Sequence, residues 1–300
     1  MGRAGWGLAL GVAAVSFAAV LIKLCSLHPL TIAAWRLGLA ALVFAAATAV
    51  CRSPASRERC PPMPWPWKGW AFLAGFCLAV HFASWIASLK LTSVASSVVL
   101  VTTNPIFVGL GSAWWLREQV SRRLWAGIAL TVAGGLVIAL GDRGAPGPDP
   151  LLGDLLALLG AVAGSAYLLV GRRTREETGL LPYVTAVYSS AAAWLVGFAL
   201  VAGAPLAGPF SARDLGLLAL IALLPQVVGH TLINWSLRFL AAGLVAVAIL
   251  GEPVGASVLA WAVLGEPVGP AQLAGGSLIL LGVGLASWPA QSVGVSRRVR

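Results

Sequence analysis

Long apolar runs, separated by short stretches that carry most of the charge, make up nearly the whole chain. A helix needs about 20 mostly apolar residues to span the hydrocarbon core of a bilayer, and ten runs meet that requirement. They lie at residues 4–24, 30–50, 69–89, 93–116, 122–141, 152–171, 182–202, 215–237, 240–264 and 270–288. Proline, glycine or charged residues mark most of the junctions, as turns require. The pattern predicts an all-α integral membrane protein of ten transmembrane helices with no soluble domain.

The composition agrees with a membrane architecture. Hydrophobic residues make up 59% of the 300 residues, charged residues make up only 10%, and the mean hydropathy is +0.91. A soluble domain carries about 25% charged residues, so a soluble enzyme of this length is excluded. The first apolar run has spanning length and lacks the small-residue cleavage site of a signal peptide. We therefore expect it to be retained as the first helix.

The distribution of charge predicts the orientation. The formal net charge is +10, but the basic residues lie in short clusters between the apolar runs, so nucleic-acid binding, which needs a continuous basic face, is not expected. With the N-terminus inside, fifteen lysines and arginines fall on the cytoplasmic side and four on the other, with Arg36 inside a helix. Cytoplasmic loops carry the excess of such residues. Both termini are therefore predicted to be cytoplasmic, with Cys25 at the outer surface and Cys51 and Cys60 inside.

The chain also repeats itself. At a shift of 148 residues, several proline, acidic and glycine positions coincide. The coinciding pairs include Pro105 and Pro253, Glu118 and Glu266, and Gly134 and Gly282. Two five-helix repeats at 1–141 and 153–288 follow from this register, with a linker at 142–152 and a basic cytoplasmic tail at 289–300. Because five is an odd number, the second repeat must be inverted relative to the first.

Inverted repeats that meet near the membrane midplane are an architecture of transporters. They supply two related arrangements of one cavity, one open to each side of the membrane. The repeat pattern therefore predicts transport by alternating access around a central cavity.

The same residues resemble a known family. The paired segments Asn104-Pro105…Leu116-Arg117-Glu118 and Glu252-Pro253…Leu264-Gly265-Glu266, with the five-plus-five duplication, resemble the EamA-type branch of the drug/metabolite transporter superfamily. Each repeat looks like one EamA domain. The resemblance implies a cavity between the first four helices of each repeat, with the fifth helices at the periphery. It also implies export of small metabolites, often amino acids, from bacteria.

Polar side chains within helices are the candidate site residues, since polar groups are costly in hydrocarbon. Glu252 lies inside the run at 240–264 beside Pro253, which removes a backbone hydrogen bond and opens the helix locally. A buried carboxylate must find a partner or take up a proton. We interpret Glu252 as a proton carrier or a ligand for a substrate amine; the alternative is a structural pair that fixes packing. The equivalent Pro105 and Pro253 are predicted to bend their helices as gating hinges.

Further candidates lie in other apolar runs. His81 and His230 either line the cavity or hydrogen-bond between helices. Trp85 lies one turn beyond His81 on the same helix face, where it offers an aromatic surface to a ligand or faces lipid. Arg36 is interpreted as a member of a structural or gating ion pair rather than a substrate contact. The remaining polar candidates within helices are Asn104, Tyr167, Gln226 and Asn234.

Glu118 and Glu266 precede the fifth helices, where a carboxylate opposes the positive end of the helix dipole; both are interpreted as structural. The helices at 122–141 and 270–288 are rich in glycine, which permits close packing, either within the chain or in a homodimer. The four cysteines form no CxxC or Cys/His pair at metal spacing. We expect neither a metal nor a cofactor.

The sequence therefore predicts a multi-pass exporter of small metabolites in the lipid bilayer of a bacterial inner membrane. Amino acids are the first hypothesis for the substrate; drugs, nucleobases and other metabolites are alternatives. A membrane enzyme acting on a lipid-linked substrate is a rival of another class, but it would need clustered carboxylates, histidines or metal ligands, and Glu252 is a single intrahelical carboxylate. A channel would need a ring of repeated polar groups, which a twofold repeat does not supply.

Overall fold

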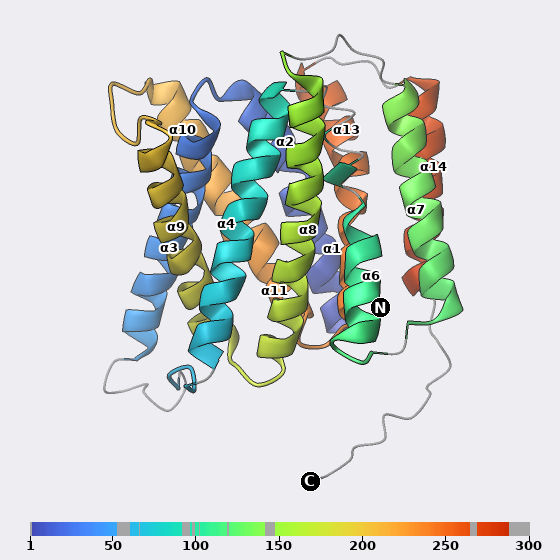
Figure 1. The fold of residues 1–300 in the computed structure, drawn as a ribbon, viewed down its shortest axis with the longest axis horizontal. Coiled ribbons are helices and arrows are strands. Elements are labelled where there is room, and N and C mark those ends of the chain that lie inside the picture. Colours follow the sequence, from blue (N-terminus) through green and yellow to red (C-terminus); the bar gives the residue numbers. More distant parts are fainter. Residues whose placement is uncertain are drawn as a thin grey trace.

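The regular structure of the described residues is helical. The computed structural model describes residues 2–52, 61–65, 67–91, 97, 100–101, 103–118, 120–141, 148–264 and 269–287. Its helices are α1 (Arg3–Val15), α2 (Phe17–Leu24), α3 (Pro29–Cys51), α4 (Trp67–Leu91), α6 (Asn104–Trp114), α7 (Arg122–Gly141), α8 (Pro150–Arg175), α9 (Leu180–Val201), α10 (Ala212–Ile221), η2 (Ala222–His230), α11 (Thr231–Ser236), α12 (Ala242–Ile249), α13 (Gly251–Leu264) and α14 (Pro270–Ser287). They form a bundle along one common direction (Figure 1).

Seven helical segments of the described chain are long and apolar enough to cross a membrane. Three of these segments are composite: α1 with α2, α10 with η2 and α11, and α12 with α13. A shorter apolar stretch, Leu273–Ala286, lies in α14. A multi-pass helical membrane protein is thus confirmed, while the count of ten crossings stays a prediction.

Predicted helices that should have been continuous are interrupted. Ser16 separates α1 from α2, and its hydroxyl donates to the Val12 carbonyl oxygen at 2.9 Å, a bond of the kind that bends helices. Leu250 separates α12 from α13, so Pro253 lies in the first turn of α13. In the first repeat, α6 begins immediately before Pro105. The first turn of a helix tolerates proline because its N–H groups have no partner within the helix. The gating role of the two prolines stays a prediction.

The predicted helix at 215–237 is not a regular α-helix. Its middle, η2, is a nine-residue π-helix that contains Pro225. Proline lacks the N–H donor of an α-helical ladder and its ring crowds the carbonyl one turn earlier, so a wider turn replaces the α-helical one. The widened segment carries Gln226 and His230.

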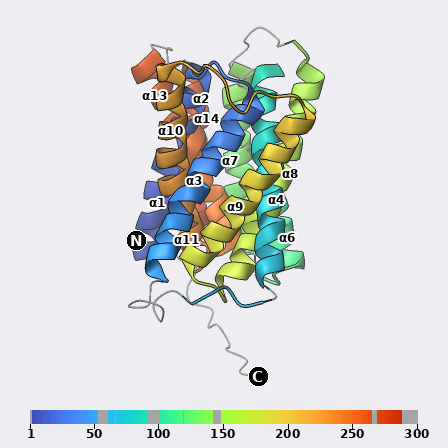
Figure 2. The ribbon, with the colours of Figure 1, turned by 90° about the vertical axis from the view of Figure 1, so that its left-hand side faces the viewer.

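Each repeat packs along the other. α3 lies along α9, and α7 lies along α14; α4 packs on α8, and α1 packs on η2 and α11. In the register of the repeat, α4 corresponds to α10–α11 and α8 corresponds to α1, so the last two packings are equivalent to each other. Figures 1 and 2 show α3 and α9 together at one end of the bundle, with α7 and α14 at the other.

Equivalent helices of the two repeats run in opposite directions. Near the start of α7, a Cβ at Gly127 would meet Ala286 near the end of α14. In the other pair, the hydroxyls of Thr48 near the end of α3 and Thr185 near the start of α9 are hydrogen-bonded at 2.8 Å. Antiparallel pairing of equivalent helices is the arrangement of an inverted repeat.

The helices α7 and α14 use small residues for contact within the chain. A Cβ at Gly134 would lie 2.5 Å from the carbonyl oxygen of Gly275, and one at Gly282 would lie 2.6 Å from Cγ2 of Thr131. Glycine therefore lets the two backbones approach each other. A homodimer through these helices stays a prediction, and it would use their outer faces, where Leu281 is 63% exposed.

Candidate functional site

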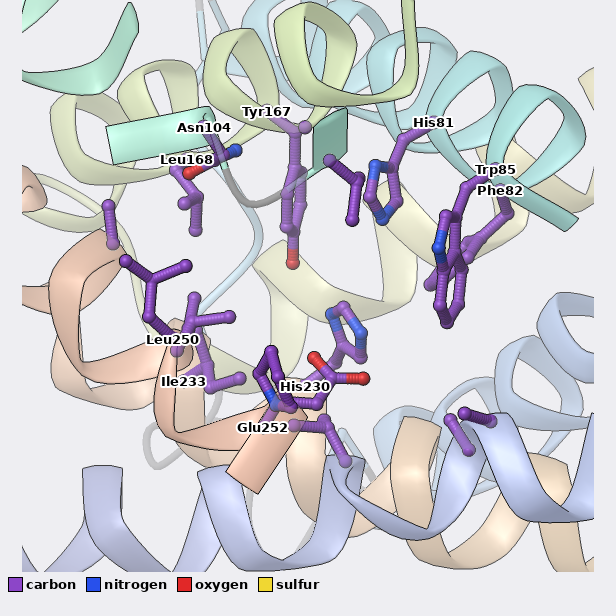
Figure 3. Close-up of a pocket in the computed structure, with 18 of the residues that line it drawn as sticks. His81, Phe82, Trp85, Asn104, Tyr167, Leu168, His230, Ile233, Leu250 and Glu252 are labelled. Carbon is purple, nitrogen blue, oxygen red and sulfur yellow. The ribbon is translucent and has the colours of Figure 1, made fainter. Parts of the chain in front are cut away.

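A central cavity lies where the two repeats meet. Its wall takes residues from α1, α2, α3, α4, α6 and α8 and from η2, α11, α12 and α13. Figure 3 shows Asn104, Tyr167 and His81 along one side of the space and His230 and Glu252 on the opposite side. Most of the remaining wall is apolar. The predicted site residues in the wall are Arg36, His81, Trp85, Asn104, Tyr167, His230, Glu252 and Pro253.

Arg36 reaches the cavity from α3 and is only 1% exposed. Its Nε donates to Oε1 of Gln226 at 2.8 Å, and its guanidinium carbon lies 4.1 Å from the centroid of the Phe82 ring, within the range of a cation–π contact. Its Nη1 has no hydrogen-bond partner among the described residues. The π-helix is therefore what orients this arginine, because it supplies Gln226.

Glu252 lies in the first turn of α13, where a carboxylate is favoured by the positive end of the helix dipole. The carboxylate interacts electrostatically with Arg36. The part of the chain that the structure describes shows no ion pair between them, so the ion pair predicted for Arg36 is not found there. A basic and an acidic side chain thus line one cavity without a direct ion pair, and each repeat supplies one of them.

An aromatic surface forms the wall on α4. The rings of His81 and Trp85 are stacked, with centroids 6.1 Å apart and an interplanar angle of 14°. His81 Nδ1 donates to the carbonyl oxygen of Gly160 at 2.8 Å; since a carbonyl only accepts, Nδ1 carries the proton. Gly164 leaves room for this ring, because a Cβ there would lie 2.8 Å from His81 Nδ1. The other nitrogen, Nε2, is the basic one in this tautomer.

His230 and Asn104 occupy other parts of the wall. The His230 ring meets Phe82 edge to face, with centroids 5.3 Å apart, and its Nδ1 has no hydrogen-bond partner among the described residues. Asn104 is held to α8 by two hydrogen bonds. Its side-chain Nδ2 donates to the Ala161 carbonyl oxygen at 3.3 Å, and its backbone carbonyl oxygen accepts from the Ser165 hydroxyl at 3.1 Å. Asn104 occupies the position in the first repeat that Glu252 occupies in the second.

Asn234 lies outside the cavity wall, in a buried polar layer between the cavity and the end of α8 at Arg175. Its Nδ2 donates to the hydroxyl of Tyr167 at 2.6 Å and to that of Tyr188 at 3.3 Å. Its backbone carbonyl accepts from Nε of Arg175 at 3.2 Å. The layer therefore lies on the side of the cavity that the charge pattern assigns to the cytoplasm.

An ionic contact lies beyond this layer, and it gives Glu118 a structural role at a different helix from the one predicted. The Glu118 carboxylate pairs with Nε of Arg172 at 2.7 Å and accepts from the backbone N of Ala242, the first residue of α12, at 3.3 Å. It therefore caps α12 of the second repeat rather than α7, the helix that follows it in sequence. Glu266, its predicted counterpart, lies outside the described residues.

A second set of contacts joins segments of the two repeats at the opposite end of the bundle. The Asp214 carboxylate accepts from the backbone N and the hydroxyl of Ser26, at 3.0 and 2.9 Å, and from the Ser211 hydroxyl at 2.7 Å. The indole N–H of Trp35 donates to the carbonyl oxygen of Leu206 at 2.9 Å. Cys25, predicted to lie at the outer surface, is only 1% exposed and packs into the core.

Sequence reasoning missed several of these groups. Phe82 and Tyr188 are aromatic residues among many others in apolar runs, and no pattern distinguishes them. Arg172 and Arg175 lie in a basic cluster that reads as a positive-inside signal, yet Arg175 is buried. Their partners include a carboxylate 54 residues away and a backbone carbonyl 59 residues away, which only tertiary structure brings close.

Comparison with known proteins now decides the family. Residues 4–140 and 151–288 each match the EamA-like transporter family. The chain belongs to the EamA-like transporter family. The two matched segments correspond to the two predicted repeats. A crystal structure shares the fold of this EamA-like protein with a TM-score of 0.75 and 22% identity over 99% of both chains.

Several curated relatives carry transporter names. The uncharacterized transporter YdfC of Bacillus subtilis is 26% identical over 71% of this chain and 69% of its own length. A riboflavin transporter of Rhizobium johnstonii is 30% identical over 48% of this chain and 47% of its own. The chain spans 63% of a probable 4-amino-4-deoxy-L-arabinose-phosphoundecaprenol flippase subunit, ArnE, of Pseudomonas fluorescens, at 31% identity over 24% of the chain. These matches support a membrane transporter of small molecules.

Proposed function

We propose that this EamA-like transporter exports small metabolites, with amino acids as the first substrate class, by alternating access of its central cavity. The observation that carries this proposal is the presence of Arg36 and Glu252, opposite charges from opposite repeats, in one largely apolar cavity. A zwitterion has a complementary pair of charges. An arginine fork suits a carboxylate, and a carboxylate suits an amine.

The rest of the wall suits the side chain of an amino acid. The His81–Trp85 stack and Phe82 offer aromatic faces, and ligand sites combine such apolar surface with a few placed polar groups. Because intracavity charges must be paired within a membrane, the charged ends of the ligand would lie between Arg36 and Glu252. Its side chain would then lie against the aromatic wall.

Alternating access requires contacts that can open at either end of the cavity. The Tyr167–Asn234–Tyr188 layer with the Arg172–Glu118 pair is one such set, and the contacts of Asp214 at the opposite end are the other. In this proposal the first set opens to load substrate from the cytoplasm and the second opens to release it. The antiparallel repeats support two such related states.

The proposal includes ten membrane crossings, both termini in the cytoplasm, and a location in a bacterial inner membrane. The charge asymmetry of the loops supports the orientation, and the curated relatives are bacterial.

Counterflow in proteoliposomes tests the proposal. Vesicles preloaded with an unlabelled amino acid should accumulate the labelled one transiently and with saturation, whereas protein-free vesicles should not. An enzyme would not produce counterflow, and a channel would not saturate in the same way. Absence of counterflow across amino acids of all side-chain classes would contradict the amino-acid assignment.

A planar heteroaromatic compound is a second candidate substrate. The stacked His81 and Trp85 rings favour it, and one relative is named a riboflavin transporter. Thermal unfolding of the purified protein with amino acids, nucleobases and flavins would separate the classes, because a ligand that binds the folded state raises its apparent stability.

A further inference from the structure

We infer that the cavity is charge-balanced, so that a carboxylate lacking an amine enters only together with one proton, whereas a zwitterion enters without one. This inference rests on the proposed binding of substrate between Arg36 and Glu252. It predicts which ligands bind in the cavity together with a proton.

Arg36 has a hydrogen-bond donor without a partner among the described residues. Its Nε is occupied by Gln226, but Nη1 is buried without a partner among the described residues. A buried donor without a partner loses the hydrogen bonds it had in water, and a guanidinium forms its strongest contacts with carboxylates. Nη1 is therefore the group in the cavity best suited to a ligand carboxylate.

Arg36 and Glu252 are separate groups of the cavity wall. Their charges interact, yet no ion pair joins them in the described structure. A ligand can therefore contact both groups, or contact Arg36 alone, without first breaking a direct pair.

The net charge of the cavity determines which ligands need a proton. Without ligand, an ionised Arg36 and an ionised Glu252 sum to zero, and a zwitterion leaves the sum at zero. A monocarboxylate brings the sum to minus one, and an uncompensated charge inside a membrane is costly. Protonation of Glu252 restores neutrality. A simple amine brings the sum to plus one, and Arg36 cannot relieve it because a guanidinium keeps its proton.

Other ionisable groups face this pair and compete for the proton. They are His81 on α4, His230 on η2, Tyr167 on α8 and Tyr188 on α9. His81 already donates from Nδ1 to a carbonyl, and Tyr167 accepts from Asn234. Glu252 is the acidic residue of the cavity wall, so the proton is assigned to it, with His230 as the rival acceptor.

Three probes with one phenyl ring separate the charge cases: L-phenylalanine, 3-phenylpropionate and phenethylamine. Binding to the purified full chain in lipid nanodiscs is measured by calorimetry between about pH 5.5 and 8, in buffers of different ionisation enthalpy. At pH values where Glu252 is ionised in the unliganded protein, uptake of one proton should weaken 3-phenylpropionate binding about tenfold per unit of rising pH, with a proton stoichiometry approaching one. At those pH values phenylalanine should bind with constant affinity and without proton uptake, and phenethylamine should bind at least about tenfold more weakly.

Variants assign the proton. In Glu252→Gln, binding of 3-phenylpropionate should lose its pH dependence while phenylalanine binds more weakly. His230→Gln and the exposed carboxylate variant Glu177→Gln should keep the wild-type slope. Loss of the slope in His230→Gln would overturn the assignment to Glu252.

Other results would overturn the inference as a whole. These are a flat pH profile for 3-phenylpropionate, proton uptake with phenylalanine, or binding of none of the probes. A flat profile combined with phenylalanine counterflow would leave the proposed export function in place. Proton-linked binding of 3-phenylpropionate without any amino-acid transport would leave the inference in place and contradict the proposed export of amino acids.

Discussion

The two repeats share a backbone plan but differ in where they place charge. Both have a helix that starts beside the cavity next to an equivalent proline, Pro105 or Pro253. The first repeat places Asn104 at this point, tied to α8 by its amide, and the second places Glu252 there. The first repeat supplies the cavity with Arg36 instead. Duplication thus yields a cavity with two related walls, and divergence gives each wall one sign of charge.

The third helices of the repeats differ in a related way. In the first repeat, α4 is an α-helix along its full length, whereas its counterpart contains the π-helix η2. The π-helix carries Gln226, which orients the arginine of the other repeat. The charged group of the first repeat therefore depends on the second repeat for its geometry.

Opposite ends of the bundle should be accessible from opposite sides of the membrane. In a background without native cysteines, Arg173→Cys and Arg213→Cys each place a thiol at an exposed position. An impermeant thiol reagent applied to right-side-out vesicles should label Arg213→Cys and spare Arg173→Cys until the membrane is permeabilised. Labelling with the reverse pattern would contradict the predicted orientation.

Packing between the fifth helices should tolerate no added atom at the contact. Gly134→Ala would place Cβ 2.5 Å from the Gly275 carbonyl oxygen, whereas Gly284→Ala on α14 meets nothing within 4 Å. Overpacking costs about 1–3 kcal/mol, while alanine in an open helical position is favoured by about 0.5–1 kcal/mol. Thermal unfolding in detergent should show opposite shifts. Equal shifts would mean that α7 and α14 do not pack as described.

The polar layer below the cavity should be specific to the second repeat. Asn234→Leu removes the donor to the Tyr167 hydroxyl, and a buried hydroxyl left without a partner costs about 1–3 kcal/mol. The equivalent position in the first repeat is the buried Ile86, where Ile86→Leu conserves volume and should cost less than about 1.5 kcal/mol. Chemical unfolding of both variants makes the comparison. A larger loss at Ile86 would contradict a structural role for the layer.

The Glu118–Arg172 pair should contribute the least to stability. Its side chains are 18% and 17% exposed, so water screens the pair only in part, and the coupling should lie near the upper end of the range for surface pairs, about 1 kcal/mol. A double-mutant cycle with Glu118→Gln and Arg172→Gln measures that coupling. A coupling of several kcal/mol would show that this end of the cavity is locked more firmly than the exposure implies.

The apolar runs were enough to predict the helical membrane class, and the coinciding prolines were enough to predict the repeat. Helix-length apolar segments and a constant spacing between equivalent residues can both be recognised in the sequence alone. The candidates in the cavity wall were predictable because polar groups such as His81 and Glu252 are rare inside apolar runs. The π-turn at Pro225 was not, because proline marks a departure from the α-helix without specifying its form.

Longer-range contacts were beyond the sequence. Glu118 appeared to cap the helix that follows it, but it caps α12 of the other repeat. Asn234 appeared equivalent to the cavity residues, but it lies one layer below them. Both differences arise because a helical position fixes a face of the helix and not the neighbour that packs against it.

In the proposed function, substrate binds between one charge from each repeat. Counterflow of a labelled amino acid in proteoliposomes, with Arg36→Gln, Glu252→Gln and the surface control Glu177→Gln, tests it most directly. Truncating one partner of a buried charge pair costs about 2–5 kcal/mol, so each cavity variant should lose at least about tenfold in apparent affinity while remaining folded. The control should transport like the wild type. Wild-type counterflow in folded Arg36→Gln and Glu252→Gln proteins would contradict the account.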